Sequence, residues 1–250
     1  MERLYLPPSL RYLEPMRVVR GAPLDHTSFA YDLVTAVRPR LVVDVGTGAG
    51  MFMAIACQAM REHDIDGLVH GIDAWSDDEG KPEDDETRWA DLNAFLRTHF
   101  RGIAYLMKMS HEDGVQHFAD GSIDILRLNA VRAGGRLGAL VDAWLPRVAK
   151  GGILICEDVN DPETPDRADE WTRATEGRPA FVFPQGKGLG VLCLGRRDGE
   201  PSPELVELLT ANDVAEREGL ARFYQHADRH HRFRNEVQSQ GANLAKRGKK

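Results

Sequence analysis

Short apolar runs alternate with amphipathic stretches along the first two thirds of the chain. The runs are rich in β-branched residues and end in glycines or acidic residues, which is typical of buried strands. The stretches between them place apolar residues at helical spacing, most clearly in 50–61 and 137–148. This alternation predicts an α/β protein with a mostly parallel sheet covered on both faces. The predicted strands are residues 41–45, 68–73, 104–107, 123–128 and 152–156.

The pattern changes after residue 180. Two further apolar runs, 181–183 and 191–194, are separated by seven residues rich in glycine. Seven residues cannot hold a crossover helix, so we expect the two runs to form an antiparallel hairpin. The hairpin would complete a sheet of seven strands.

Residues typical of helix caps predict where several helices begin and end. Lys150-Gly151-Gly152 is expected to end the helix over 137–148. Ser202 is expected to be the N-cap of a helix whose first residue is Pro203, and a long polar helix follows with an interruption near Asn212-Asp213. The predicted organisation is an N-terminal segment 1–24, a domain 25–197, a helical extension 201–240 and a basic tail 241–250.

Composition excludes several classes of protein. The chain is 42% hydrophobic and 28% charged, as in ordinary globular proteins, and no run approaches the roughly 18 apolar residues of a membrane span. The net charge is −7 although the C-terminal end is basic, so we expect neither nucleic acid nor a membrane as a partner. Three scattered cysteines argue against a disulfide framework or a zinc site and suit a cytoplasmic protein.

The turn after the first predicted strand carries candidate chemistry. Asp44-Val45-Gly46-Thr47-Gly48-Ala49-Gly50 joins a strand to a helix, the context in which a glycine loop approaches a nucleotide. Asp73 ends the second strand, where a carboxylate can accept hydrogen bonds from a ribose diol. The spacing Gly-x-Gly-x-Gly differs from the Gly-x-Gly-x-x-Gly of dinucleotide loops. A nicotinamide enzyme and a turn that binds nothing remain the alternatives.

This loop, together with the acidic residue and the hairpin, resembles the class I S-adenosylmethionine-dependent methyltransferases, which implies a Rossmann-like fold. Further motifs resemble one branch of that class, near glycan and natural-product O-methyltransferases. The resemblance covers roughly residues 20–196, and these further motifs are residues 28–34, 38–40, 71–75, 118–124, 144–146 and 188–192.

The resemblance implies a set of cofactor contacts. The glycines would wrap the methionine end, Asp44 would help to hold that end, and Asp73 would bind the ribose hydroxyls. His111 follows the third strand, where relatives contact the adenine ring. The full set of expected cofactor-binding residues is Asp44, Gly46, Thr47, Gly48, Gly50, Asp73, Ala74, Trp75, Ser110, His111 and Asn129.

The chain departs from this branch after the fourth strand. Relatives usually carry an aspartate and histidines there, whereas this chain has Asn129 flanked by Arg127 and Arg132. Asn129 cannot act as a base. Glu157 and Asp158, at the end of the fifth strand, are therefore the candidate catalytic bases.

The same departure bears on the acceptor and on metal binding. Arg127 and Arg132 are candidates for binding an anionic acceptor, because guanidinium groups match carboxylate and phosphate, and His26 is a candidate on the acceptor side. A divalent metal held by Glu157, Asp158 and Asn160 is an alternative that we do not favour, because the usual aspartate is missing.

The sequence thus predicts methyl transfer from S-adenosylmethionine to a hydroxyl of a small molecule or sugar, by in-line displacement. One alternative is a cofactor-binding homologue that has lost methyl transfer and acts as a partner or sensor protein. Another is an enzyme that uses the same cofactor for a different reaction. The long C-terminal helix also suggests a homodimer.

Overall fold

The computed structural model of the chain describes residues 6–19, 25–76, 82–196, 199 and 201–247. Parts of the predicted N-terminal segment and basic tail lie outside the described residues. The elements in chain order are α1 (Ser9–Tyr12), α2 (Thr27–Val37), β1 (Leu41–Val45), α3 (Met51–Glu62), β2 (Leu68–Asp73), α4 (Pro82–His99), β3 (Ala104–Lys108), α5 (His111–Gly114), η1 (Val115–His117), β4 (Ile123–Leu128), α6 (Ala130–Ala133), α7 (Leu137–Trp144), η2 (Leu145–Arg147), β5 (Val148–Glu157), α8 (Asp166–Ala174), β6 (Ala180–Phe183), β7 (Leu189–Cys193), α9 (Glu204–Thr210) and α10 (Val214–Arg247).

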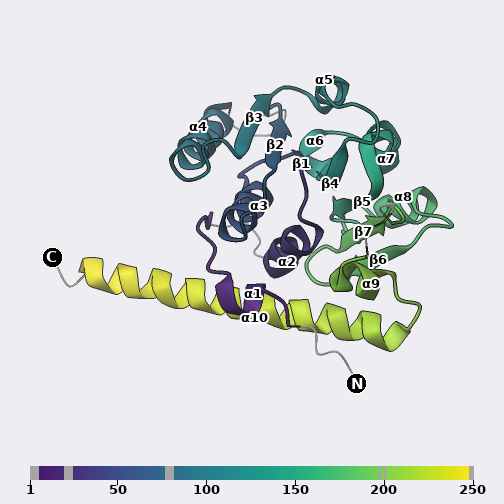
Figure 1. The fold of residues 1–250 in the computed structure, drawn as a ribbon. Coiled ribbons are helices and arrows are strands. Elements are labelled where there is room, and N and C mark those ends of the chain that lie inside the picture. Colours follow the sequence, from purple (N-terminus) through teal and green to yellow (C-terminus); the bar gives the residue numbers. More distant parts are fainter. Residues whose placement is uncertain (1–5, 20–24, 77–81, 197–198, 200, 248–250) are drawn as a thin grey trace.

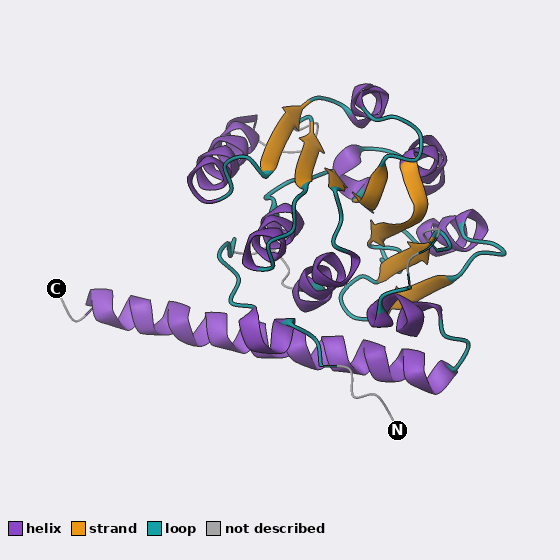
Figure 2. Ribbon diagram, in the orientation of Figure 1, coloured by secondary structure: helices purple, strands orange, loops and turns teal. Residues whose placement is uncertain are grey.

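The seven strands form one sheet in the order β3-β2-β1-β4-β5-β7-β6. The first five are parallel, and β7 runs antiparallel to both β5 and β6. The predicted hairpin is therefore confirmed, as is the mostly parallel α/β sheet. Helices flank the sheet on both faces (Figures 1 and 2). The strand register also sets Asp44 beside Arg127.

Alternate residues of each strand enter two separate cores. In β1, Val42 belongs to the core under α2, α3, α9 and α10, whereas Val43 belongs to the core under α7 and α8. Both side chains are fully buried. A strand that is buried on both faces needs a continuous apolar run, and this explains why the strands were recognisable in the sequence.

Two local predictions were wrong. Residues Lys150–Gly152 do not end a helix: α7 ends at Trp144, and the glycines lie inside β5, where Gly151 has φ +75° and its N–H bonds to Leu194 O at 2.7 Å. Glycine in the left-handed conformation occurs at irregularities within strands as well as at the ends of helices. Ser202 is not the N-cap, because α9 begins at Glu204 and Pro203 holds the cap position.

The interruption predicted near Asn212-Asp213 separates α9 from α10, and Asp213 Oδ1 accepts the N–H of Ala215 at 2.7 Å as a helix cap. Helix α10 has 34 residues, passes α9 and α2, and continues beyond the body of the protein (Figure 1). It is long, yet neither it nor any other helix in the described ranges has the apolar stretch needed to cross a membrane.

Candidate active site

The loop between β1 and α3 has the backbone conformation that its glycines predict. Gly46, Gly48 and Gly50 all have positive φ, at +74°, +55° and +75°. A Cβ on Gly46 would lie 2.7 Å from Asn129 O, and one on Gly50 would lie 2.3 Å from Leu92 Cδ1. Side chains at these two positions are therefore excluded by conformation and by space.

A cavity of about 360 Å³ opens beside this loop at the carboxyl edge of the sheet. Its walls are the glycine loop, the start of α2, the ends of β4 and β5, and the loop between β6 and β7. Ten of the predicted site residues line it: His26, Gly46, Thr47, Gly48, Gly50, Arg127, Asn129, Arg132, Glu157 and Asp158.

A buried ionic network forms the floor of this cavity. Arg127 Nη1 lies 2.6 Å from Asp44 Oδ1, and Nη2 lies 2.5 Å from Glu157 Oε2. Burial alone would lower the pKa of Arg127, but the two carboxylates outweigh burial and raise it, so the guanidinium stays charged. Asn129 Nδ2 donates to the same Glu157 oxygen at 2.9 Å. One guanidinium therefore joins the ends of β1, β4 and β5.

Asp158 follows Glu157 but has a different environment. Its backbone has φ +59°, a left-handed conformation that costs free energy in a residue other than glycine. Burial raises the pKa of its carboxyl group, and the charge of Glu157 raises it further. Strained backbone and a perturbed carboxyl group beside a cavity are typical of a reacting group.

Asp73 lies behind the glycine loop rather than in the cavity wall. Its Oδ2 accepts the N–H of Gly48 at 2.8 Å, and its Oδ1 accepts the N–H of Trp75 at 2.8 Å. Arg132 contacts both of its oxygens. Trp75 in turn donates its indole N–H to Gly48 O at 3.1 Å, which fastens β2 to the loop. Ala74 lies between Asp73 and Trp75 and is exposed.

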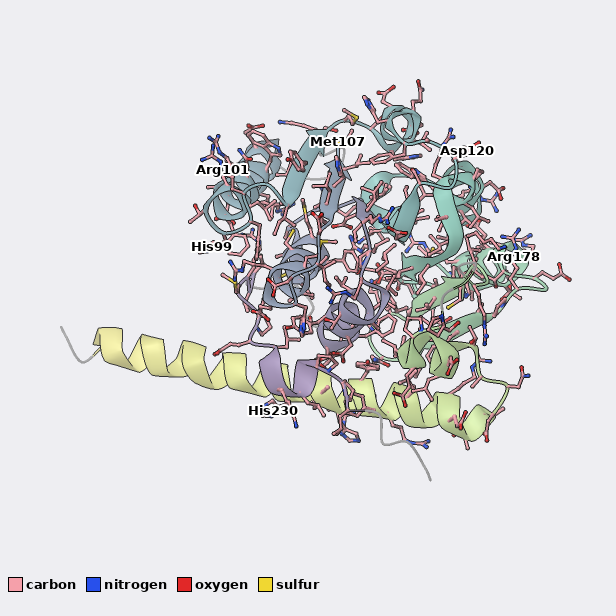
Figure 3. The ribbon with its side chains drawn as sticks, in the orientation of Figure 1. His99, Arg101, Met107, Asp120, Arg178 and His230 are labelled. Atoms are coloured by element: carbon pink, nitrogen blue, oxygen red, sulfur yellow. The ribbon has the colours of Figure 1, made fainter. Side chains whose placement is uncertain are left out.

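The predicted adenine contacts are not part of the cavity wall. Ser110 is the N-cap of α5 and accepts the N–H of Asp113 at 3.2 Å, whereas His111 Nε2 lies 3.1 Å from Glu112. Among the residues labelled in Figure 3, Arg101, Asp120 and Arg178 are exposed and point outward from the rim of the protein.

The structure adds cavity residues that sequence reasoning missed, among them Asp25, Phe29, Phe52 and Lys187. The sequence could have indicated Lys187, because its loop joins two antiparallel strands at the carboxyl edge of β5, next to Asp158. Asp25 had none, because only the packing of α2 brings it to the cavity. Within the described part of the chain, no group of three or more His, Cys, Asp or Glu side chains could hold a metal ion.

Residues 43–159 match a protein family described as a methyltransferase domain. This match covers just under half of the chain, from the first strand of the sheet to the end of the fifth. The resemblance to methyltransferases that the glycine loop indicated is therefore confirmed over residues 43–159.

Solved structures of methyltransferases share the fold of this chain. A methyltransferase of Geobacter sulfurreducens has a TM-score of 0.52 at 18% identity, over 68% of this chain and 79% of that one. A methyltransferase of Podospora anserina, solved with bound S-adenosylhomocysteine, has a TM-score of 0.50 at 13% identity, over 69% and 78%. The uncharacterised protein y4gI of Sinorhizobium fredii is 26% identical over 191 residues. That match covers 76% of this chain and 21% of y4gI, so the chain spans about a fifth of the length of that relative.

Proposed function

We propose that the protein transfers the methyl group of S-adenosylmethionine to a hydroxyl of a small molecule or sugar. The observation that carries this proposal is the cavity itself, which connects the glycine loop at one end with Asp158 at the other. The cofactor would supply an electrophilic methyl group on its sulfonium centre. The chain then needs to align the acceptor with that methyl group and to remove the hydroxyl proton.

The glycine loop suits the cofactor for two reasons. No side chain projects from Gly46, Gly48 or Gly50, so a ligand can approach the main chain closely. Asp44 and Glu157 share a single cation, Arg127, so this buried group keeps a net negative charge when both carboxylates are ionised. Negative charge at this edge favours a cationic ligand such as a sulfonium. The ribose would bind at Asp73, which touches the same loop through Gly48.

Asp158 is the base in this proposal, and Glu157 is a positioning residue. Glu157 already accepts hydrogen bonds from Arg127 and Asn129, which keep its Oε2 atom occupied. The pKa of Asp158 is raised by burial, which makes its carboxylate a better proton acceptor than an exposed aspartate. No step requires a metal ion.

Two of these contacts also favour a second candidate, a cofactor-binding homologue that no longer transfers methyl groups. Glu157 is tied to Arg127, and Asp73 is tied to Arg132. In each pair an arginine occupies a carboxylate, which leaves fewer carboxylates to accept a proton from the acceptor or hydrogen bonds from the ribose.

Calorimetry and turnover together test the two candidates. We expect S-adenosylhomocysteine, the demethylated product, to bind the purified protein. We also expect S-adenosylhomocysteine to accumulate when S-adenosylmethionine is supplied together with hydroxyl acceptors such as phenols and sugars. Binding without turnover, with every acceptor class, would favour the homologue that has lost transfer. Absence of binding to either nucleoside would overturn both candidates.

A further inference from the structure

Arg132 makes a two-point contact with the carboxylate that the proposed cofactor needs. Its Nη2 lies 3.1 Å from Asp73 Oδ1, and its Nε lies 3.4 Å from Asp73 Oδ2. The side chain of Asp73 is 2% exposed and that of Arg132 is 25% exposed. The pair thus has a buried anion and a cation that reaches it from the cavity wall.

All of the acceptor positions of Asp73 are used by the protein itself. A carboxylate has about four lone-pair sites. The main-chain N–H groups of Gly48 and Trp75 take two of them, each at 2.8 Å, and Arg132 takes the other two at longer distances. A vicinal diol donates two hydrogen bonds, so it can bind this carboxylate only if two donors leave.

Arg132 is the donor that can leave. Gly48 and Trp75 donate from the main chain, and the indole of Trp75 also bonds to Gly48 O, so neither moves without rearranging the loop. The backbone of Arg132 is held in place as well, because its N–H bonds to the Asn129 side chain at 3.1 Å. Its long side chain can rotate away into the cavity while its backbone stays fixed.

We propose that Arg132 occupies the ribose position of the cofactor site and must leave Asp73 before the cofactor binds, so that it sets the affinity for the cofactor. This inference rests on the proposed function, because it takes the ribose diol to be the competing ligand. Two guanidinium N–H donors and two ribose hydroxyls are alternative partners for the same pair of oxygens. The free energy of the ion pair is then subtracted from that of cofactor binding.

The test is calorimetric titration with S-adenosylhomocysteine. We expect Arg132→Ala to lower the dissociation constant about fivefold, the size expected for loss of a partly exposed ion pair. Arg132→Lys offers one point charge instead of a fork and should give an intermediate value. The matched control is Arg136→Ala, which removes the Arg136–Glu170 pair, 2.7 Å long, at the start of α7 and outside the cavity. It should leave the dissociation constant unchanged.

A double-variant cycle separates competition from a general loosening of the loop. In an Asp73→Asn background there is no carboxylate for Arg132 to block, so adding Arg132→Ala should give no further tightening. Tightening of equal size in both backgrounds would overturn the proposal. So would unchanged or weaker binding in Arg132→Ala, because then Arg132 is not a competitor. Absence of binding in wild type and in Arg132→Ala alike would instead remove the proposed function.

Discussion

Two adjacent acidic residues, Glu157 and Asp158, have different environments at the end of β5. Glu157 accepts hydrogen bonds from a guanidinium and an amide, whereas Asp158 has a raised pKa and a left-handed backbone. The end of the strand causes this difference, because Glu157 is the last residue of β5 whereas Asp158 has already left the strand with a left-handed backbone. Two chemically equivalent residues thereby acquire separate roles.

We expect Asp158→Asn to lower kcat for methyl transfer about 100-fold or more, because an amide cannot accept the acceptor's proton. Asparagine tolerates the left-handed backbone, so the variant should melt near the wild-type temperature. In wild type, kcat should fall with decreasing pH at a higher pH than for an ordinary aspartate, because burial raises the pKa of Asp158. Steady-state kinetics across pH provides the test, and an unchanged kcat in Asp158→Asn would remove the assignment.

Arg127 supports a second prediction at this scale. Replacing it with methionine would leave Asp44 and Glu157 close together without their shared cation. We expect a loss of about 3–5 kcal/mol in the free energy of unfolding, measured by urea denaturation. Arg222→Met removes an exposed pair with Glu218 and should cost about 1 kcal/mol or less. Equal losses in the two variants would contradict a central role for the network.

At the scale of elements, α10 is fastened to α2 by a buried carboxylate. Asp228 Oδ2 accepts the N–H of His26 at 2.7 Å, and its Oδ1 accepts the N–H of Ser28 at 3.1 Å. The N-cap position of α2 is His26, whose side chain makes no cap bond, so a residue from a distant helix serves as the cap. Nearby, Asp32 accepts hydrogen bonds from Ser9 and Tyr224.

These contacts predict an unusual dependence of stability on pH. Burial raises the pKa of Asp32 to about 6 and that of Asp228 to about 6, from an ordinary value of 3.8. The folded state therefore binds more protons than the unfolded state between these values. The contribution of each group to the free energy of unfolding is fully present below pH 3.8 and is lost as pH rises to about 6. That contribution is about 3 kcal/mol for each.

Other carboxylates favour the folded state in the opposite direction, so the measurement compares two proteins. Urea denaturation of wild type and Asp32→Asn between pH 4.5 and pH 7 should show a smaller fall of stability with rising pH in the variant. Parallel curves would mean that Asp32 is ionised in the folded protein throughout this range.

Local signals explain which elements the sequence could predict. The glycine loop and the hairpin are recognisable because each depends on residues close together in the chain, at φ values or loop lengths that few sequences allow. Lys150–Gly152 misled the same reasoning, since glycine at positive φ is common to helix ends and strand irregularities. The contacts Arg132–Asp73 and Asp228–His26 join residues 59 and 202 positions apart, and no local pattern encodes such pairs.

On the scale of the whole molecule, the two halves of α10 differ in position: the first half passes the body of the protein, and the helix then continues beyond it (Figure 1). Among the side chains that the structure describes, those of Arg217, Leu220, Tyr224 and Asp228, in the first half of the helix, contact the body. We expect a chain that ends after residue 231 to keep its melting temperature within a few degrees and to keep its affinity for S-adenosylhomocysteine. If the second half mediates the expected homodimer, sedimentation will show a lower mass for the shortened chain. A loss of ligand affinity would show that the second half supports the cavity.

The bond between Ser28 and Asp228 spans 200 positions and ends on the helix that forms one wall of the cavity. During synthesis, the ribosome completes the glycine loop and the whole sheet long before it adds Asp228. In a growing chain the α2 wall of the cavity therefore lacks its cap until Asp228 has been added, so we expect the proposed cofactor to stabilise the fold fully only after that point. Added cofactor should thus protect a chain that contains Asp228 from unfolding more than it protects one that ends before this residue.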